Sequence, residues 1–397
     1  MPALQRFARV LRAPDVARLL SAAILARMPI GIDSLGMVLF VRAETGSFAR
    51  AGLVAAAFGL AIGLSAPALG RLIDHHSHAR VMLPLAALHA ASLGALVALG
   101  VAGAPTGALV ACSFAAGISS PPVGSVVRPL LAGLLSHEED LLPTAYALDG
   151  IAIEMVFVTG PLLTAAIVVV ASPAVALLVA CGFVLLGTLV LVTTPASRAW
   201  RPDARQHERH LLGALASPGV RTIVAATAPV GFALGATEVT MTAFAADHGS
   251  RAAAGALMAA WAAGSGVGGL AYGGREHTFA PGPRWVRLAA VFPLCSLPLL
   301  LAPSILAMAP LALIAGLCLA PYMAAANQLI GDVAPPGAVT EAFAWPITAI
   351  GLGAAGGSAT AGAIAQGWGW RPGFGAVVVA GAVTAVIALA GRATVRA

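Results

Sequence analysis

Twelve apolar stretches of about 20 residues divide the chain, six on each side of a polar segment near residue 205. A helix of about 20 residues at 1.5 Å per residue spans the hydrocarbon core of a bilayer. Hydrophobic residues make up 59% of the sequence and charged residues 10%, a composition that a water-soluble surface does not tolerate. We therefore expect an all-α membrane protein with twelve transmembrane helices. The expected spans are residues 18–41, 50–70, 81–101, 106–130, 144–171, 174–195, 219–244, 252–273, 286–302, 304–331, 338–366 and 373–391.

The basic residues indicate how these spans are oriented. All 22 basic side chains are arginines, and most lie in the loops and termini on one side of the expected bilayer. The loops on the other side carry only Arg42, Arg50, Arg251 and Arg371. Because arginine-rich loops stay in the cytoplasm, we expect a multi-pass protein of the cell membrane with both termini cytoplasmic. The net charge of +6 is explained by this orientation, so no nucleic-acid partner is expected.

The two halves of the chain repeat each other in parallel. Residues 145–148 (AYAL) align with residues 342–345 (AFAW), and Gly160 aligns with Gly357 at the same offset. A parallel six-helix repeat is typical of one group of secondary transporters, in which the site lies between the repeats. The expected domains are an N-terminal six-helix bundle (1–197), a cytoplasmic linker (198–217) and a C-terminal six-helix bundle (218–397).

A second pair of matching segments lies in the fourth and tenth spans. Ala-Gly followed by proline in residues 116–122 aligns with the same pattern in residues 315–321, which sets Arg128 opposite Asn327. Prolines inside a span predict kinks in the helix. Both spans are therefore expected to bend.

The segment after the second span, Gly70 to Arg80 (GRLIDHHSHAR), resembles the loop signature of the major facilitator superfamily, Gly-x-Leu-Ala-Asp-Arg-x-Gly-Arg-Arg/Lys. Gly70, Leu72 and Asp74 match the signature. Arg80 supplies a basic residue, whereas Ser77 replaces the second glycine. The resemblance implies two six-helix bundles, related by pseudo-two-fold symmetry, around a central cavity lined by the first, fourth, seventh and tenth helices.

A buried ion pair is expected near the middle of the N-terminal half. Arg27 lies about nine residues into the first span, roughly 13 Å deep, where an isolated charge is costly. Asp149 and Glu154 reach a comparable depth in the fifth span, which neighbours the first span in the family's fold. We therefore expect Arg27 to pair with Glu154 or Asp149. The pair is either a static bridge or one that breaks when a proton or substrate binds.

The acidic residues within the spans are candidates for proton coupling: Asp33, Asp149, Glu154 and Glu238. Desolvation favours the protonated form of a carboxyl group, which can then take a proton from one side of the membrane and release it on the other. Asp149 and Glu154 are about 140° apart around a helix, so one of them is left without Arg27. Glu238 is alternatively a gate, a site for a cationic substrate or a solvated acid. His89 is either a packing residue or a proton relay.

Charged residues at the inner ends of the spans suggest a latch. Arg128 ends the fourth span and Glu341 begins the eleventh, with Asp74 and Arg80 adding charge nearby. An Arg128–Glu341 pair would close the inner side of the cavity. Solvated interfacial charges are an equally good interpretation of these two residues.

Few aromatic residues are available to line a cavity. Trp261, Tyr322 and Trp345 lie in the eighth, tenth and eleventh spans, and we expect them to line the substrate cavity together with Asn327. All four cysteines lie inside apolar stretches without metal-type spacing. No disulfide, metal site or cofactor is expected.

Together these features predict a secondary active transporter that exports a small organic solute, such as a drug, metabolite or sugar, by proton-coupled alternating access. The alternatives are proton-coupled uptake of a small anion bound by Arg27 and, with less support, a non-transporting membrane sensor or an enzyme. The signature of drug/proton antiporters, Arg-x-x-Gln-Gly, falls on residues 113–117, where Ser113 and Ala116 replace its polar residues, so its proton role is not carried over. The expected partners are the solute, protons and the bilayer, and we expect a monomer without enzymatic activity.

Overall fold

The computed structural model describes residues 3–138, 141–200, 213–273, 280–335 and 339–395, and all regular secondary structure in these ranges is helical. Twelve helical spans within these ranges are long and apolar enough to cross a membrane, which confirms the predicted all-α fold class. In the first half the helices are α1 (Ala3–Arg12), α2 (Val16–Thr45), α3 (Phe48–His75), α4 (His78–Val101), α5 (Thr106–Ile118), α6 (Val123–Leu134), α7 (Leu142–Val170), α8 (Pro173–Val192) and α9 (Pro195–Ala199). In the second half they are η2 (Ala214–Ala216), α10 (Pro218–Asp247), α11 (Ala253–Gly273), α12 (Pro281–Ser296), η3 (Leu297–Leu301), α13 (Ile305–Gly316), α14 (Leu319–Val333), α15 (Val339–Trp368) and α16 (Trp370–Ala390).

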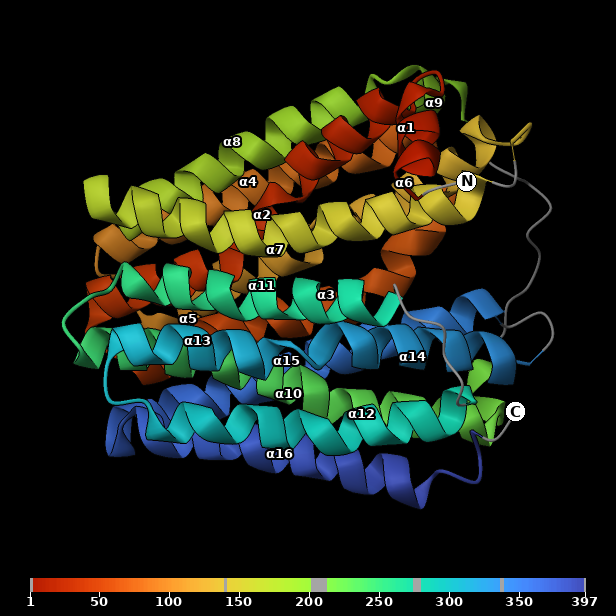
Figure 1. Ribbon diagram of the computed structural model, residues 1–397. Helices are drawn as coiled ribbons and strands as arrows, with labels where there is room; N and C mark the ends of the chain where they lie inside the picture. The colour runs from red at the N-terminus through yellow and green to blue at the C-terminus, as the bar shows by residue number, and fades with distance from the viewer. Residues whose placement is uncertain (1–2, 139–140, 201–212, 274–279, 336–338, 396–397) are drawn as a thin grey trace.

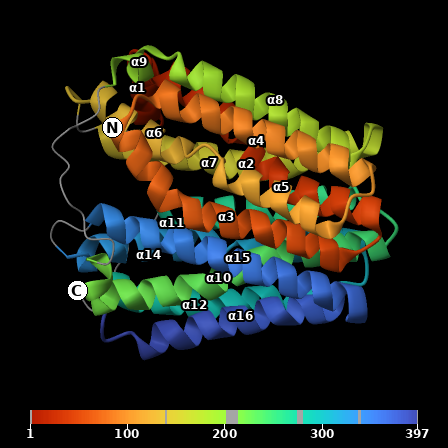
Figure 2. The same ribbon diagram turned by 180° about the vertical axis from the view of Figure 1, so that it is seen from behind.

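The long helices form two groups, α2 to α8 (the N-terminal group) and α10 to α16 (the C-terminal group), which lie side by side (Figures 1 and 2). Both chain termini lie at one end, here called the termini end, and the other is called the opposite end. The same pairings recur in each group: α2 packs on α7 and α8 as α10 packs on α15 and α16. This recurrence is what a parallel repeat requires, and the pseudo-two-fold axis stays a prediction. Residues 201–212 of the predicted linker lie outside the described residues.

Serines start several of these helices. The side-chain oxygens of Ser47, Ser172, Ser217 and Ser304 each accept a hydrogen bond from a backbone N–H in the first turn of the following helix. Such caps satisfy donors that have no partner within the helix, and at Ser172 and Ser217 a proline follows, where its missing N–H costs nothing. These caps fix where α3, α8, α10 and α13 begin.

The fourth and tenth spans are broken at corresponding places. The fourth span consists of α5 and α6, separated by residues 119–122, which include Pro121 and Pro122. The tenth consists of α13 and α14, separated by residues 317–318, shortly before Pro321. Proline has no N–H to donate to the carbonyl of the preceding turn, and its ring clashes with that carbonyl. The helix is therefore interrupted in the turn that precedes these prolines. The predicted bends are full breaks.

The two groups meet along two seams, α3 against α15 and α7 against α11. Glycines allow the close approach on the first seam: a Cβ on Gly63 would lie 3.2 Å from the carbonyl oxygen of Thr348. Other glycines of these helices serve contacts inside the C-terminal group: Gly264 and Gly268 approach Leu313 and Leu317 of the tenth span, and Gly353 and Gly357 approach α10.

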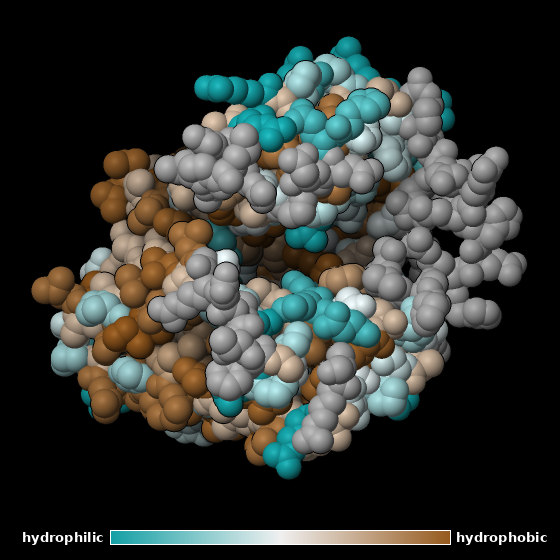
Figure 3. All heavy atoms as spheres, turned by 45° about the vertical axis from the view of Figure 1, so that its right-hand side comes forward, coloured by the Kyte–Doolittle hydropathy of each residue, from teal (hydrophilic) through white to brown (hydrophobic). Residues whose placement is uncertain are grey.

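The groups are separated at the termini end. Figure 3 shows a hollow between them at that end, with hydrophilic residues around its rim and hydrophobic walls further in. Near its C-terminal end, α3 bends toward α6 (Figure 2). A passage between the two groups is therefore open toward the termini end.

Candidate functional site

Asp149 of α7 is bonded to two arginines inside the N-terminal group. Its Oδ1 lies 2.5 Å from Arg27 Nη1 of α2, and both side chains are buried, at 2% and 0% exposure. Its Oδ2 lies 3.5 Å from Nε of Arg128 on α6, whose side chain is 61% exposed. Of the two carboxylates expected beside Arg27, the structure therefore places Asp149 there. Because Asp149 already neutralises Arg27, the guanidinium is not free to hold an anionic solute in this conformation.

Glycine brings the helices of this pair together. A Cβ on Gly160 of α7 would lie 2.6 Å from Cα of Gly31 of α2, and a Cβ on Gly187 of α8 would collide with the backbone of Ala26. Close backbone approach at small residues is the usual way in which helices associate within a membrane. It fixes the depth and rotation of α2, and so the position of Arg27.

Glu154 is the carboxylate left without an arginine. It lies on α7 about 140° from Asp149 and is half-buried, facing α11 across a seam between the groups. Its Oε2 lies 3.9 Å from the position that a Cβ on Gly266 would take. Among the described residues it has no hydrogen-bond or ion-pair partner. A carboxylate at this seam is available to a proton or a cationic group.

Polar bonds join the two groups in the half of the molecule near the opposite end. Ser34 of α2 donates a hydrogen bond of 2.7 Å to Glu238 Oε2 of α10. The backbone N–H of Phe48, at the start of α3, donates to Gln366 Oε1 of α15 over 2.9 Å. Together with the glycine seam they hold the opposite end closed.

A cavity of about 630 Å³ lies beyond this closure, at the opposite end itself. It is lined from both groups, by Arg42 and Phe48 on one side and by Asp247, His248 and Trp370 among others on the second. The guanidinium of Arg42 stacks over the Phe48 ring at 4.6 Å, and Trp370 Nε1 donates to Asp247 Oδ2 over 3.2 Å. These contacts shape a polar vestibule at the opposite end.

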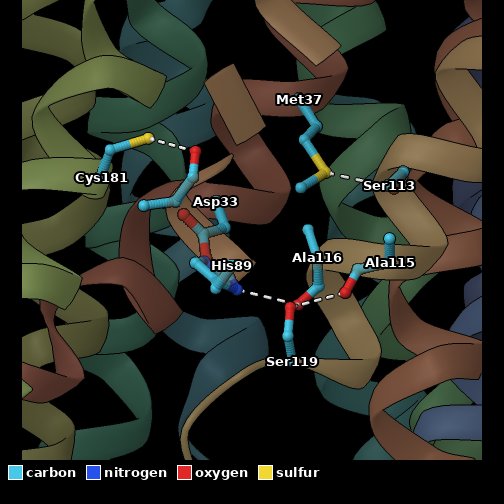
Figure 4. Close-up of polar contacts among 9 residues, drawn as sticks. Asp33, Met37, His89, Ser113, Ala115, Ala116, Ser119 and Cys181 are labelled. Atoms are coloured by element: carbon cyan, nitrogen blue, oxygen red, sulfur yellow. Dashed lines mark hydrogen bonds and ion pairs between the residues drawn. The ribbon is translucent and has the colours of Figure 1, made fainter. Parts of the chain in front are cut away.

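Asp33 of α2 pairs with His89 of α4 in the interior of the N-terminal group. His89 Nε2 lies 3.0 Å from Asp33 Oδ2, and both side chains are buried. The other ring nitrogen, Nδ1, lies 2.8 Å from the carbonyl oxygen of Ala116 at the end of α5 (Figure 4). The sequence names each residue separately but not their pairing. Their similar depth, near the middle of two spans, was the one feature of the sequence that could have indicated this pairing.

The predicted latch is not formed in this conformation. Arg128 is bonded to Asp149, and Glu341 accepts hydrogen bonds from the Ala214 backbone and from Trp345 Nε1, both over 3.2 Å. Each residue is thus engaged within its own half of the chain, because the hollow separates the two groups at this end. Arg80 is exposed on α4, and the side chain of Asp74 lies outside the described residues.

Of the four residues predicted to line the substrate cavity, one is buried in the core and the other three are at least partly exposed. Tyr322 is 1% exposed and packs against the ring of Trp285 in the core of the C-terminal group, so it does not line the hollow. The turn of α14 that carries Tyr322 faces α12. A uniformly apolar span does not show which of its faces is turned toward which neighbour. Trp261 is half-buried against the core, Trp345 is bonded to Glu341, and Asn327 is exposed on α14.

The cysteines contain one close pair. Cys295 of α12 and Cys318, at the break before α14, have their Sγ atoms 3.2 Å apart, and all four cysteines are free thiols. No group of three or more histidine, cysteine, aspartate or glutamate side chains in the described part of the chain is placed to hold a metal.

Comparisons with known proteins agree with this architecture. A family model described as Major Facilitator Superfamily matches residues 19–271 and 223–396. No curated protein matches the chain.

Several solved transporters share the fold at low sequence identity. A mutant of the nucleoside transporter NupG is 14% identical with a TM-score of 0.76, over 96% of this chain and 99% of that one. The human organic anion transporter MFSD10 (TETRAN) is 17% identical with a TM-score of 0.64, over 94% and 100%. A bacterial homologue of the iron transporter ferroportin, in its inward-facing state, is 13% identical with a TM-score of 0.67, over 95% and 98%. At such identities the likeness is one of fold.

Proposed function

Because the chain belongs to the major facilitator superfamily, we propose that it exports a small organic solute, such as a drug, metabolite or sugar, in exchange for protons. The termini end faces the cytoplasm in this proposal, as the arginine asymmetry indicates. Residues 1–197 and 218–397 act as two bundles joined by the linker 198–217. The protein works as a monomer in the cell membrane.

One observation carries the proposal: the passage between the two groups is open at the termini end and closed at the opposite end. A transporter that works by alternating access has two such states and passes the solute between them. The bonds from Ser34 to Glu238 and from Phe48 to Gln366 would break in the second state. Tilting of one group against the other along the seams supplies the movement.

Glu154 is the residue at which a solute and a proton would compete. Its carboxylate lies at the seam and has no partner among the described residues, and a partly desolvated carboxylate binds protons readily. If one carboxylate holds either a proton or a polar solute, an inward proton gradient drives the solute outward. Uptake of an anion on Arg27 has less support, because Asp149 would first have to release the guanidinium.

Transport by purified protein in liposomes tests the proposal. We expect at least one compound of a chemically varied panel to be transported faster when a pH gradient is imposed, and we expect Glu154→Gln to lower that gradient-driven flux at least tenfold. Glu44→Gln is the matched control, because Glu44 is an exposed carboxylate at the end of α2 and should leave the flux unchanged. Flux that ignores the gradient, or that Glu154→Gln leaves intact, contradicts proton exchange at Glu154.

A further inference from the structure

The break between α5 and α6 leaves several carbonyls without their usual backbone donors, and that of Ala116 is one of them. Pro121 and Pro122 have no N–H, so the carbonyls four residues before them lose their usual donors. The N–H of Ser120 turns instead to the carbonyl of Gly117, at 3.2 Å. The carbonyl of Ala116, which Ser120 would serve in a continuous helix, is therefore free to accept from side chains.

His89 supplies that donor from the neighbouring helix α4. Its Nδ1 lies 2.8 Å from the Ala116 oxygen, and the Ser119 hydroxyl lies 3.2 Å from the same atom (Figure 4). A carbonyl oxygen can only accept, so Nδ1 must carry a hydrogen. The break thus fixes the tautomer of His89 and turns Nε2 toward Asp33.

The contact between His89 and Asp33 then requires one further proton, carried by either Nε2 or the carboxyl group. At 3.0 Å, either Nε2–H donates to the Asp33 carboxylate or a protonated Asp33 donates to Nε2. The pair is neutral overall in both arrangements. Without that proton, the lone pair of Nε2 and the carboxylate oxygen face each other as two buried acceptors, which is unfavourable.

Nothing else described around the pair compensates a lost proton. The titratable group that faces it from α8 is the Cys181 thiol, which is directed to the carbonyl of Ala90 at 3.5 Å. From α3 the neighbour is the ring of Phe58, at 6.3 Å between ring centres. The nearest cation on α2, Arg27, is bonded to Asp149. Deprotonation would leave an uncompensated buried charge.

We propose that Asp33 and His89 form a proton-binding site, separate from Glu154, that sets the angle between α5 and α6. Loss of the proton drives Nε2 away from Asp33, withdraws Nδ1 from the Ala116 carbonyl and leaves the hinge free to move. The movement reaches the central ion cluster, because Arg128 lies on α6 and is bonded to Asp149. The proposal rests on the proton-coupled transport proposed above and names a second group that would respond to the proton.

Spin labels on the two halves of the broken span test it without measuring transport. Gly107 in the first turn of α5 and Gly133 near the end of α6 both face open space, so Gly107→Cys and Gly133→Cys can carry labels once the native cysteines are replaced. We expect the distance between the labels to change by about 2 Å, the scale of helix shifts, between about pH 5 and about pH 9. Asp33→Asn, which stays neutral and can still donate to Nε2, should abolish the change.

His89→Asn is the second variant, because its amide can still donate to Ala116 but cannot hold the proton. We expect it to abolish the pH-dependent change as well, while Glu154→Gln retains it. A change that persists in both Asp33→Asn and His89→Asn, or no change in the parent protein, overturns the proposal. A change lost only in Glu154→Gln overturns it as well and leaves transport coupled through Glu154. If the label distances behave as expected but flux in liposomes ignores the pH gradient, the transport proposal fails instead.

Discussion

At the scale of single residues, Asp149 is the point where three helices are joined by charge. Each of its carboxylate oxygens accepts from a different arginine, one buried and one exposed. Arg27 Nη2 is buried without an acceptor among the described residues, so Asp149 is the residue that neutralises this guanidinium. Removing the carboxylate would leave a bare cation inside the N-terminal group.

Asp149→Asn should therefore destabilise the protein by about 3 kcal/mol, because breaking one side of a buried pair leaves an unpaired charge. The midpoint of thermal unfolding in detergent measures this. The double variant Arg27→Met with Asp149→Leu removes both charges and should recover most of the stability. A double variant that is stable and still transports would show that the pair is only structural. A double variant that is stable but inactive would show that the Arg27–Asp149 pair takes part in the transport cycle.

At the scale of helices, the fourth and tenth spans are interrupted at corresponding places. In each half a side chain from the adjacent outer helix reaches the interruption: His89 of α4 bonds Ala116, and Cys295 of α12 touches Cys318. Interrupted helices at corresponding places in two repeats are typical of elements that bend or bind in transporters. Bending at these interruptions breaks fewer backbone hydrogen bonds than bending within a continuous helix.

Replacing Pro121 and Pro122 together by alanine would restore two N–H donors to the fourth span. We expect α5 and α6 to fuse into a straighter helix, with the protein folded but its flux reduced at least tenfold, because the hinge is lost. Flux in liposomes and amide hydrogen exchange across residues 115–123 provide the measurements. Pro105→Ala is the control, since Pro105 precedes α5 and interrupts nothing. Normal flux through a fused helix would show that the break is not a hinge.

At the scale of the whole molecule, closure of the opposite end depends on how tightly α3 and α15 pack. A Cβ on Gly52 would lie 2.9 Å from Cα of Gly362, so even a small side chain forces the seam apart. Because closing one end of the passage accompanies opening of the other, a disturbed seam should shift the population away from the state described here.

Gly52→Val should lower access to the hollow from the termini end. Asn327 is exposed on α14 and is predicted to line the hollow, so a membrane-impermeant maleimide is expected to label Asn327→Cys in inside-out vesicles, in a background without native cysteines. Gly52→Val should slow this labelling several-fold. Gly107→Val is the control, because a side chain there meets open space. Equal labelling rates in both variants would mean that this seam does not control the opening. Labelling only in right-side-out vesicles would reverse the assigned orientation.

The expected spans agree with the observed helices to within a few residues at most ends, because span length and apolar composition are set by the bilayer. What the sequence does not reveal is the rotation of each helix about its axis. Lipid and protein core are both apolar, so a span such as α8 or α16 has no clear hydrophobic stripe to indicate its buried face. Tyr322 was placed in the cavity for this reason, whereas the structure buries it against Trp285. The partner of His89 could not be identified because pairing between helices depends on the same rotations.

The interrupted fourth and tenth spans also bear on the history of the chain. If the two halves descend from the duplication of one ancestral six-helix unit, an interruption shared by both was already present in that ancestor. The side chains that now touch it, an imidazole in one half and a thiol in the other, were then acquired after the copies diverged. On that account bending is the older property of the chain, and the sensitivity to protons proposed for Asp33 and His89 would be a later specialisation of a single half.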